Sequence, residues 1–171
     1  MAWTKKIWLI ALLICFSFSG CLRYSFTGTS IPEGVDTIFI PFFSDQSNSG
    51  LGDLSDRLNQ ALINRFVNQS RLQLANSEGE ADAVLEGVII SYSNRPFSIG
   101  GDEQADQNEV VIAVQASFKF TNEEDVEWDK SFRGNFTYDP AENPIEGENE
   151  AASGALQQVA NNMFSDAVSN W

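Results

Sequence analysis

The chain has 171 residues and is strongly acidic: 24 Asp and Glu stand against 10 Lys and Arg, a formal net charge of −14. This balance argues against nucleic acid as a partner, because binding to phosphates needs clustered basic residues. The chain contains no His and two Cys, so catalysis through His, a disulfide framework and a CxxC redox pair are not expected. The length suits a single domain.

The first twenty residues have the pattern of a lipoprotein signal peptide. Two lysines precede an apolar run, Ile7 to Phe18, which is followed by Ser19-Gly20-Cys21. The run is too short for a membrane-spanning helix, which needs about 20 apolar residues, and small residues stand directly before the Cys, where a signal peptidase cuts. We therefore expect removal of residues 1–20 and lipidation of Cys21. The alternative is a secretory signal, or a short buried helix, with a coincidental Cys.

The segment after the predicted cut, residues 21–34, is expected to be a short lipidated tether. Gly28, Pro32 and Gly34 break regular structure there, and its shortness should keep the domain close to the membrane. Cys15 leaves with the signal and Cys21 carries lipid, so no thiol remains for a metal site or a redox pair. We expect one domain over residues 35–171, with no cofactor.

Periodicity predicts four strands and two helices in the domain. The strands are expected at residues 36–43, 82–95, 110–121 and 125–138, and the helices at residues 53–69 and 148–171. Pro41 cannot donate to a ladder, which places the first strand at an edge or at a bulge. Asp53 is a predicted N-cap. The apolar stripe of the second helix runs to Trp171, which predicts that the C-terminus is packed against the domain.

The second strand is expected to carry apolar residues on both faces, because something packs on each side. Ala83, Leu85 and Ile89 share one face with Gly87, which would let a helix approach closely. Tyr92 belongs to the opposite face in this alternation, and Pro96 is expected to end the strand.

The alternation of apolar and polar residues sets the register of the hairpin formed by the last two strands. A slip of one residue would place acidic side chains opposite core phenylalanines, so Phe118 should pair with Trp128 and Val114 with Phe132. The same register puts Lys119 opposite Glu127 as a cross-strand charge pair. Lys130 falls on the apolar parity, which suggests only a snorkelling stem at a sheet margin.

Two loops contain chain-breaking or acidic residues. Residues 139–147 form a breaker-rich connection, and residues 98–108 form a Gly-rich acidic loop. Asp102, Glu103, Asp106 and Glu109 raise the possibility of a calcium site, but their spacing does not match the EF-hand pattern. We therefore expect a solvated loop and no metal.

The predicted order is strand, helix, three strands, helix, which gives an α+β fold. We expect a two-layer α/β sandwich with a four-stranded, mostly antiparallel sheet and both helices packed on one face. The helices should cover the face that bears Val114, Phe118, Trp128 and Phe132. The opposite face is polar and is left for a partner; its residues on the last two strands are Gln115, Ser117, Asp129, Ser131, Arg133 and Asn135.

The order of several short motifs resembles one known family. The motifs are Tyr24-Ser25-Phe26-Thr27-Gly28, Ser30-Ile31-Pro32, a strand ending in paired Phe, a helix ending before Leu72-Gln73-Leu74, Leu85-Glu86-Gly87 and a C-terminal Trp. Together they resemble the LPS-assembly lipoprotein family LptE, in its Bacteroidetes form. The resemblance implies a lipoprotein, anchored in the outer membrane and facing the periplasm, that plugs the LPS-assembly β-barrel LptD, assists its folding and takes part in lipopolysaccharide delivery.

The residues also bear on two other functional classes, an enzyme and a lipid carrier. An enzyme is not expected, because the sequence has no His, no G-x-S-x-G elbow and no P-loop. A stand-alone periplasmic lipid carrier is the alternative, and it would need an apolar cavity. Few basic residues lie on the strands, so the plug role is favoured over direct lipopolysaccharide binding, and no ligand residues are assigned.

Overall fold

The structure is a computed structural model that describes residues 31–97, 107–123 and 125–169. Cys21, the acidic loop up to Asp106 and Trp171 lie outside the described residues, as does the predicted signal segment. The elements are, in chain order, β1 (Thr37–Phe39), β2 (Ser44–Asp45), α2 (Leu54–Ile63), the π-helical turn η1 (Asn64–Asn68), β3 (Gln73–Leu74), the 3-10 turn η2 (Glu78–Glu80), β4 (Ala83–Phe97), β5 (Gln107–Phe120), β6 (Trp128–Tyr138) and α3 (Pro144–Ser169).

The described strands form one sheet in the order β3-β1-β4-β5-β6, and β2 also pairs with β4. The three long strands β4, β5 and β6 are an antiparallel meander, whereas β1 runs parallel to both of its neighbours. The predicted α+β sandwich is confirmed. The structure adds the short strand β3 and divides the predicted first strand into β1 and β2.

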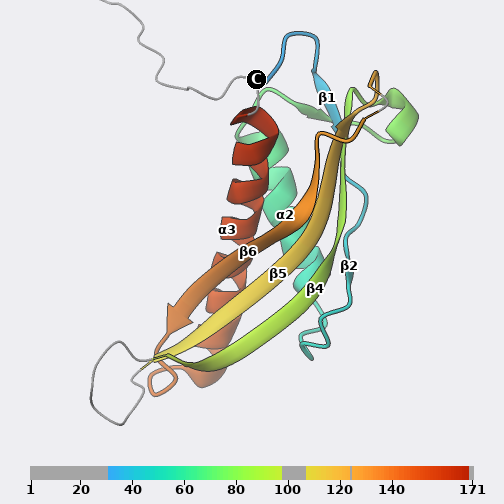
Figure 1. Ribbon diagram of the computed structural model, residues 1–171. Coiled ribbons are helices and arrows are strands. Elements are labelled where there is room, and N and C mark those ends of the chain that lie inside the picture. The colour runs from blue at the N-terminus through green and yellow to red at the C-terminus, as the bar shows by residue number, and fades with distance from the viewer. Residues whose placement is uncertain (1–30, 98–106, 124, 170–171) are drawn as a thin grey trace, which may run out of the picture.

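Both helices cover the same face of the sheet, as predicted (Figure 1). The core lies between the layers, where the alternate residues of β5 and β6 meet the apolar stripe of α3. Phe118 and Trp128 are 4% and 7% exposed, and their rings stack with centroids 5.7 Å apart. Periodicity therefore identified the buried face correctly.

The hairpin register is confirmed: Phe118 pairs with Trp128 and Val114 with Phe132. The predicted Lys119–Glu127 pair is wrong, because Nζ of Lys119 lies 2.7 Å from Oε1 of Glu78 in the η2 turn, and β6 begins only at Trp128. Lys130 now has an explanation, since its ammonium group forms an ion pair with Asp166 of α3. The lysine reaches past the sheet margin to the helix layer.

The predicted first strand is interrupted at Pro41. β1 ends at Phe39, β2 begins at Ser44, and the proline lies in the unpaired segment between them, where its missing N–H breaks no ladder. The interruption also breaks the alternation that would place Phe42 on the same face as the buried Ile38 and Ile40. Phe43 is fully buried, whereas Phe42 is 60% exposed.

Strand β4 is longer than predicted and changes face. It runs through Pro96, which pairs with Asn108 of β5; past Ile89 it has no second paired strand among the described residues, so a residue without an N–H is tolerated at this edge. A bulge between Ile89 and Ser91 shifts the register. Tyr92 therefore pairs with the buried Ile112 and packs against the core, on the face opposite to the predicted one.

The helices occur where they were predicted, but their first residues differ in role. Asp53 stands at the N-cap of α2 without a side-chain cap bond, because its carboxylate accepts from Arg57 at 2.8 Å. The second helix begins at Pro144 instead of residue 148. Proline suits the first helical position, where no backbone donor is needed.

A glycine does allow close approach of a helix to the sheet, but it is Gly134 on β6. A Cβ at Gly134 would lie 2.0 Å from the carbonyl oxygen of Ala155 in α3, so only glycine fits. At Gly87 a Cβ would instead meet the Phe43 ring at 2.6 Å. The helix approach predicted at Gly87 is therefore wrong.

Candidate partner-facing site

The six predicted partner-facing residues lie together on the face of the sheet that the helices leave uncovered. Gln115 pairs with Ser131, and Ser117 pairs with Asp129. Arg133 and Asn135 continue the same face of β6, opposite Ala113 and Val111. The two β5 residues are half-buried and the four β6 residues are exposed. The structure thus brings the whole predicted set into one surface, and whether a partner binds there remains a prediction.

Hydrogen bonds across the strands hold several of these side chains in place. The amide of Gln115 donates to Oδ1 of Asp129 at 2.6 Å. The amide of Asn135 donates to Oε1 of Glu109 at 3.0 Å, and Arg95 forms an ion pair with the same glutamate at 2.8 Å. The open face is therefore ordered by its own polar contacts before any partner arrives.

Glu109 was missed as a partner-facing residue, because the sequence analysis grouped it with the carboxylates of the acidic loop. It lies on β5 and is only 7% exposed, held between Arg95 on one neighbouring strand and Asn135 on the other. A buried charge needs such partners. The sequence could have shown this, because alternation along the strand puts Glu109 on the same face as Gln115 and Ser117.

The free edge of β6 is partly covered by amides from α3. The backbone N–H of Asn135 donates to the Gln158 side chain at 2.7 Å, and the Asn162 amide donates to the carbonyl of Arg133 at 3.3 Å. Unpaired edge groups otherwise invite strand addition. The covered stretch of the edge is less open to partners than the sheet face beside it.

The β4 side of the open face carries apolar residues, as predicted for a strand that is apolar on both faces. Phe42 and Ile90 are 60% and 43% exposed, and Val88 is half-buried. A shallow groove of about 430 Å³ runs from Pro41 and Phe42 over the sheet to Asp129. Val88 and Ile90 lie on the face that alternation along the strand predicts, whereas the exposed Phe42 was missed because the break at Pro41 interrupts the predicted first strand.

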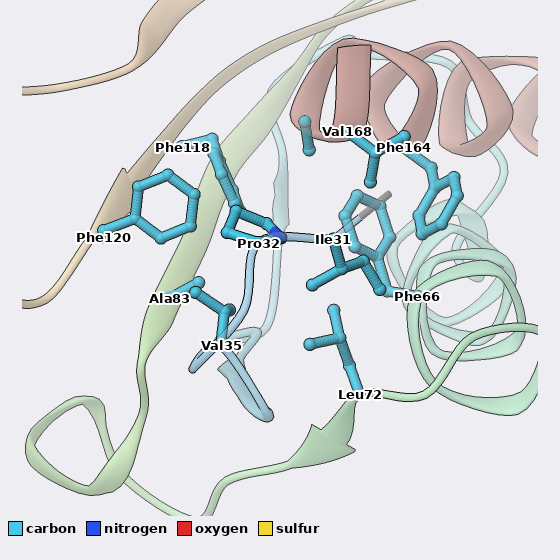
Figure 2. A pocket seen from close by; sticks show the side chains of 11 residues that line it. Ile31, Pro32, Val35, Phe66, Leu72, Ala83, Phe118, Phe120, Phe164 and Val168 are labelled. Carbon is cyan, nitrogen blue, oxygen red and sulfur yellow. The ribbon is translucent and has the colours of Figure 1, made fainter. Parts of the chain in front are cut away.

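An apolar pocket lies where the described chain enters the domain. Figure 2 shows Ile31 beside the ring of Phe66, Pro32 beside Phe118 and Val35 beside Ala83, all in the lining of this pocket. The remaining cavity is about 10 Å³, roughly what a single water needs and far below the volumes of about 300 to 1,000 Å³ of ligand pockets. This pocket cannot receive a lipid chain as it stands, which disfavours its use by a lipid carrier.

Arg71 fastens the same entry segment. Its guanidinium group donates to the carbonyls of Ile31 and Pro32 at 3.1 and 2.5 Å and pairs with Asp36 at 2.6 Å. The segment is thus docked on the domain from Ile31 onward.

Within the described ranges, no three acidic, His or Cys side chains lie close enough together to hold a metal ion. The same residues include no helix that is both long and apolar enough to cross a membrane. The acidic loop up to Asp106 and Cys21, the predicted lipidation site, fall outside these ranges.

Solved structures of low sequence identity share this fold. A hypothetical protein from Chlamydia trachomatis superposes with a TM-score of 0.52 at 8% identity, covering 78% of this chain and 93% of that one. A Xanthomonas campestris protein gives 0.52 at 12% identity, with 80% and 87% covered. PelC from Paraburkholderia phytofirmans, solved as a dodecamer, gives 0.51 at 13% identity, with 83% and 95% covered. These likenesses establish the fold alone.

No curated protein matches the chain in a sequence search. A family model does match: it is described as LptE, lipopolysaccharide-assembly, and it spans residues 35–168, nearly the whole described domain. This match supports the expectation that the chain is not an enzyme. The chain belongs to the LptE family and has a role in lipopolysaccharide assembly.

Proposed function

We propose that this chain is a lipid-anchored plug of the outer-membrane β-barrel that assembles lipopolysaccharide, the LptD barrel. The observation that carries the proposal is an ordered, polar and uncovered sheet face in a chain of the LptE family. The lumens of large outer-membrane barrels are polar. A domain inside such a lumen needs a polar outer surface of this kind.

The charge of the domain favours contact with the barrel over contact with lipopolysaccharide itself. Of the seven basic residues described, five are in ion pairs with acidic side chains. A strongly acidic chain with so few free cations is poorly suited to bind an anionic ligand. Direct lipopolysaccharide binding is therefore no part of the proposal.

The anchor in this proposal is Cys21, which would place the protein on the inner leaflet of the outer membrane, facing the periplasm. Cys21→Ser should block processing and leave an unlipidated precursor in the full chain. Electrophoretic size and uptake of labelled palmitate measure this. A variant that still reaches mature size and still takes up palmitate would show that the lipoprotein assignment is wrong.

The plug role is tested by changing the open face while the core stays intact. The triple variant Gln115→Trp, Ser117→Trp and Arg133→Glu adds bulk and reverses a charge. Pull-down of the full chain through a C-terminal tag should recover a large β-barrel with the wild type and lose it with the variant, since broken matching at a buried interface costs about 2 to 5 kcal/mol.

A matched control uses the same three positions with conservative changes, Gln115→Asn, Ser117→Thr and Arg133→Lys. This control should retain the barrel. Melting of each purified domain checks that all variants are folded. A folded triple variant that keeps full association with the barrel would contradict the proposed geometry, and a monomer that carries extractable lipid would support the carrier instead.

A further inference from the structure

One row of side chains crosses the open face and ends in a carboxylate on each side. Glu86 of β4 pairs with Ser117 of β5, and Ser117 pairs with Asp129 of β6. Both acidic side chains belong to exposed residues. Each has one neutral partner in the described chain: the Ser117 hydroxyl lies 3.5 Å from Oε1 of Glu86, and the Gln115 amide is bonded to Asp129.

The groove of the open face contains this row and adds an aromatic ring. It is lined by Phe42 and Val88 together with the two carboxylates, and its volume is about 430 Å³. Ser44 of β2 pairs with Val88, so the chain two residues earlier brings Phe42 alongside Glu86. The Phe42 ring is 60% exposed and is free to contact whatever enters the groove.

Neither carboxylate of the row forms an ion pair with a described basic residue. The ammonium group of Lys119 on the same face is held by Glu78 at 2.7 Å, and its charge also acts on Glu86 without forming an ion pair. An acidic groove with an exposed ring is complementary to a cationic group, since carboxylates accept charge-assisted hydrogen bonds and an aromatic face attracts a cation.

We propose that this groove receives a basic side chain, Arg or Lys, from the wall of the barrel that the chain plugs. The inference rests on the proposed function and names the chemistry of the partner at this surface. A guanidinium group suits the site well, because it can bond to a carboxylate and stack on the Phe42 ring at the same time. Lipopolysaccharide is disfavoured here, because its phosphates would meet two carboxylates.

The first test places a photo-crosslinking amino acid at Ser117, in the middle of the row, in the full chain expressed in its own cells. Mass spectrometry of the crosslinked product should identify a barrel peptide that contains Arg or Lys at or beside the crosslink. Crosslinks to a barrel segment without basic residues, or to lipopolysaccharide, would overturn the inference.

The second test removes the two charges and keeps the shapes, with Glu86→Gln and Asp129→Asn. Retention of the barrel should weaken at least about 30-fold, the loss expected when a hydrogen-bonded interfacial charge pair is broken. Its dependence on salt should flatten as well, because the attraction lost is electrostatic. Phe42→Ala should weaken retention by about 2- to 5-fold, as expected for an exposed cation–π contact.

The matched control removes two charges from exposed positions of the helix layer, Asp56→Asn and Glu150→Gln. It should bind the barrel as the wild type does. If the wild type recovers no barrel at all, the proposed function fails. If the wild type recovers the barrel and the groove variant retains it equally well, the inference about the groove fails while the plug role stands.

Discussion

The two faces of the central sheet differ although they are built from alternate residues of the same strands. On β5, Val114 and Phe118 are 0% and 4% exposed under the helices, while their neighbours Gln115 and Ser117 are half-buried on the open side. The helix-covered face stabilises the fold through apolar burial. The open face contributes polar contacts and is free to bind, so substitutions on the two faces should have opposite consequences for stability and association.

The largest effect is expected from truncating the covered face. Phe118→Ala or Trp128→Ala should lower the free energy of unfolding by about 3 to 5 kcal/mol, because each leaves a cavity between stacked rings. Chemical or thermal denaturation of the domain measures this change. A melting temperature equal to that of the wild type would break the distinction between the two faces.

A smaller loss is expected where the helix touches the strand backbone. Gly134→Ala should cost about 3 kcal/mol, the upper end for overpacking, because the new methyl group would meet the Ala155 carbonyl. Asn135→Ala, at the next residue on the open face, serves as the comparison and should cost less. Equal denaturation midpoints for the two variants would show that α3 does not lie against Gly134.

The third variant removes a charged contact, made by Asp82 at the end of the sheet, and its effect is compared with the loss of apolar burial. The Asp82 carboxylate accepts from the N–H groups of Asp36 and Thr37 at 2.9 Å each and from the Thr37 hydroxyl at 2.8 Å. These donors, the Asp36 N–H first, lower the pKa of Asp82 below its ordinary value of 3.8. Asp82→Asn should cost about 1 to 2 kcal/mol at neutral pH.

The cost of Asp82→Asn should depend on pH in one direction. Because the folded pKa is lowered, the carboxylate contributes its full stability above the unfolded value of 3.8 and loses it as the pH falls through the folded pKa. Wild type and variant should therefore converge in denaturant unfolding at acidic pH. The Phe118→Ala difference should not close in this way, since no titrating group is removed. A gap for Asp82→Asn that stays constant into acid would contradict this assignment.

The smallest effect on stability is expected on the open face. Arg133→Glu should change the free energy of unfolding by no more than about 0.5 kcal/mol, as is usual for exposed positions, while it weakens association with the barrel. Denaturation of the isolated domain and pull-down of the full chain measure the two quantities. A large loss of stability would mean that the open face supports the fold in its own right.

Local patterns in the sequence determined the elements and the faces of the hairpin. Apolar and polar residues alternate clearly along β5 and β6, with Lys130 as an exception. A shift of one residue would bury acidic side chains, so only one register was compatible with a core. The same parity placed Gln115, Ser117, Asp129, Ser131, Arg133 and Asn135 on one surface. The stripe of α3 was equally legible, because its apolar residues recur at helical spacing over many turns.

The rest was decided by tertiary contacts, for which no short-range pattern exists. The burial of Phe43 against Gly87, the bulge that turns Tyr92 inward and the salt bridge from Lys119 to Glu78 each join residues far apart in the chain. A break or a bulge reverses the alternation beyond it, which is why the exposed Phe42 and the groove beside it could not be read from periodicity. The alternation of side chains between two faces is a local property of a strand, whereas the neighbour that covers a residue is set by the packing of the whole domain.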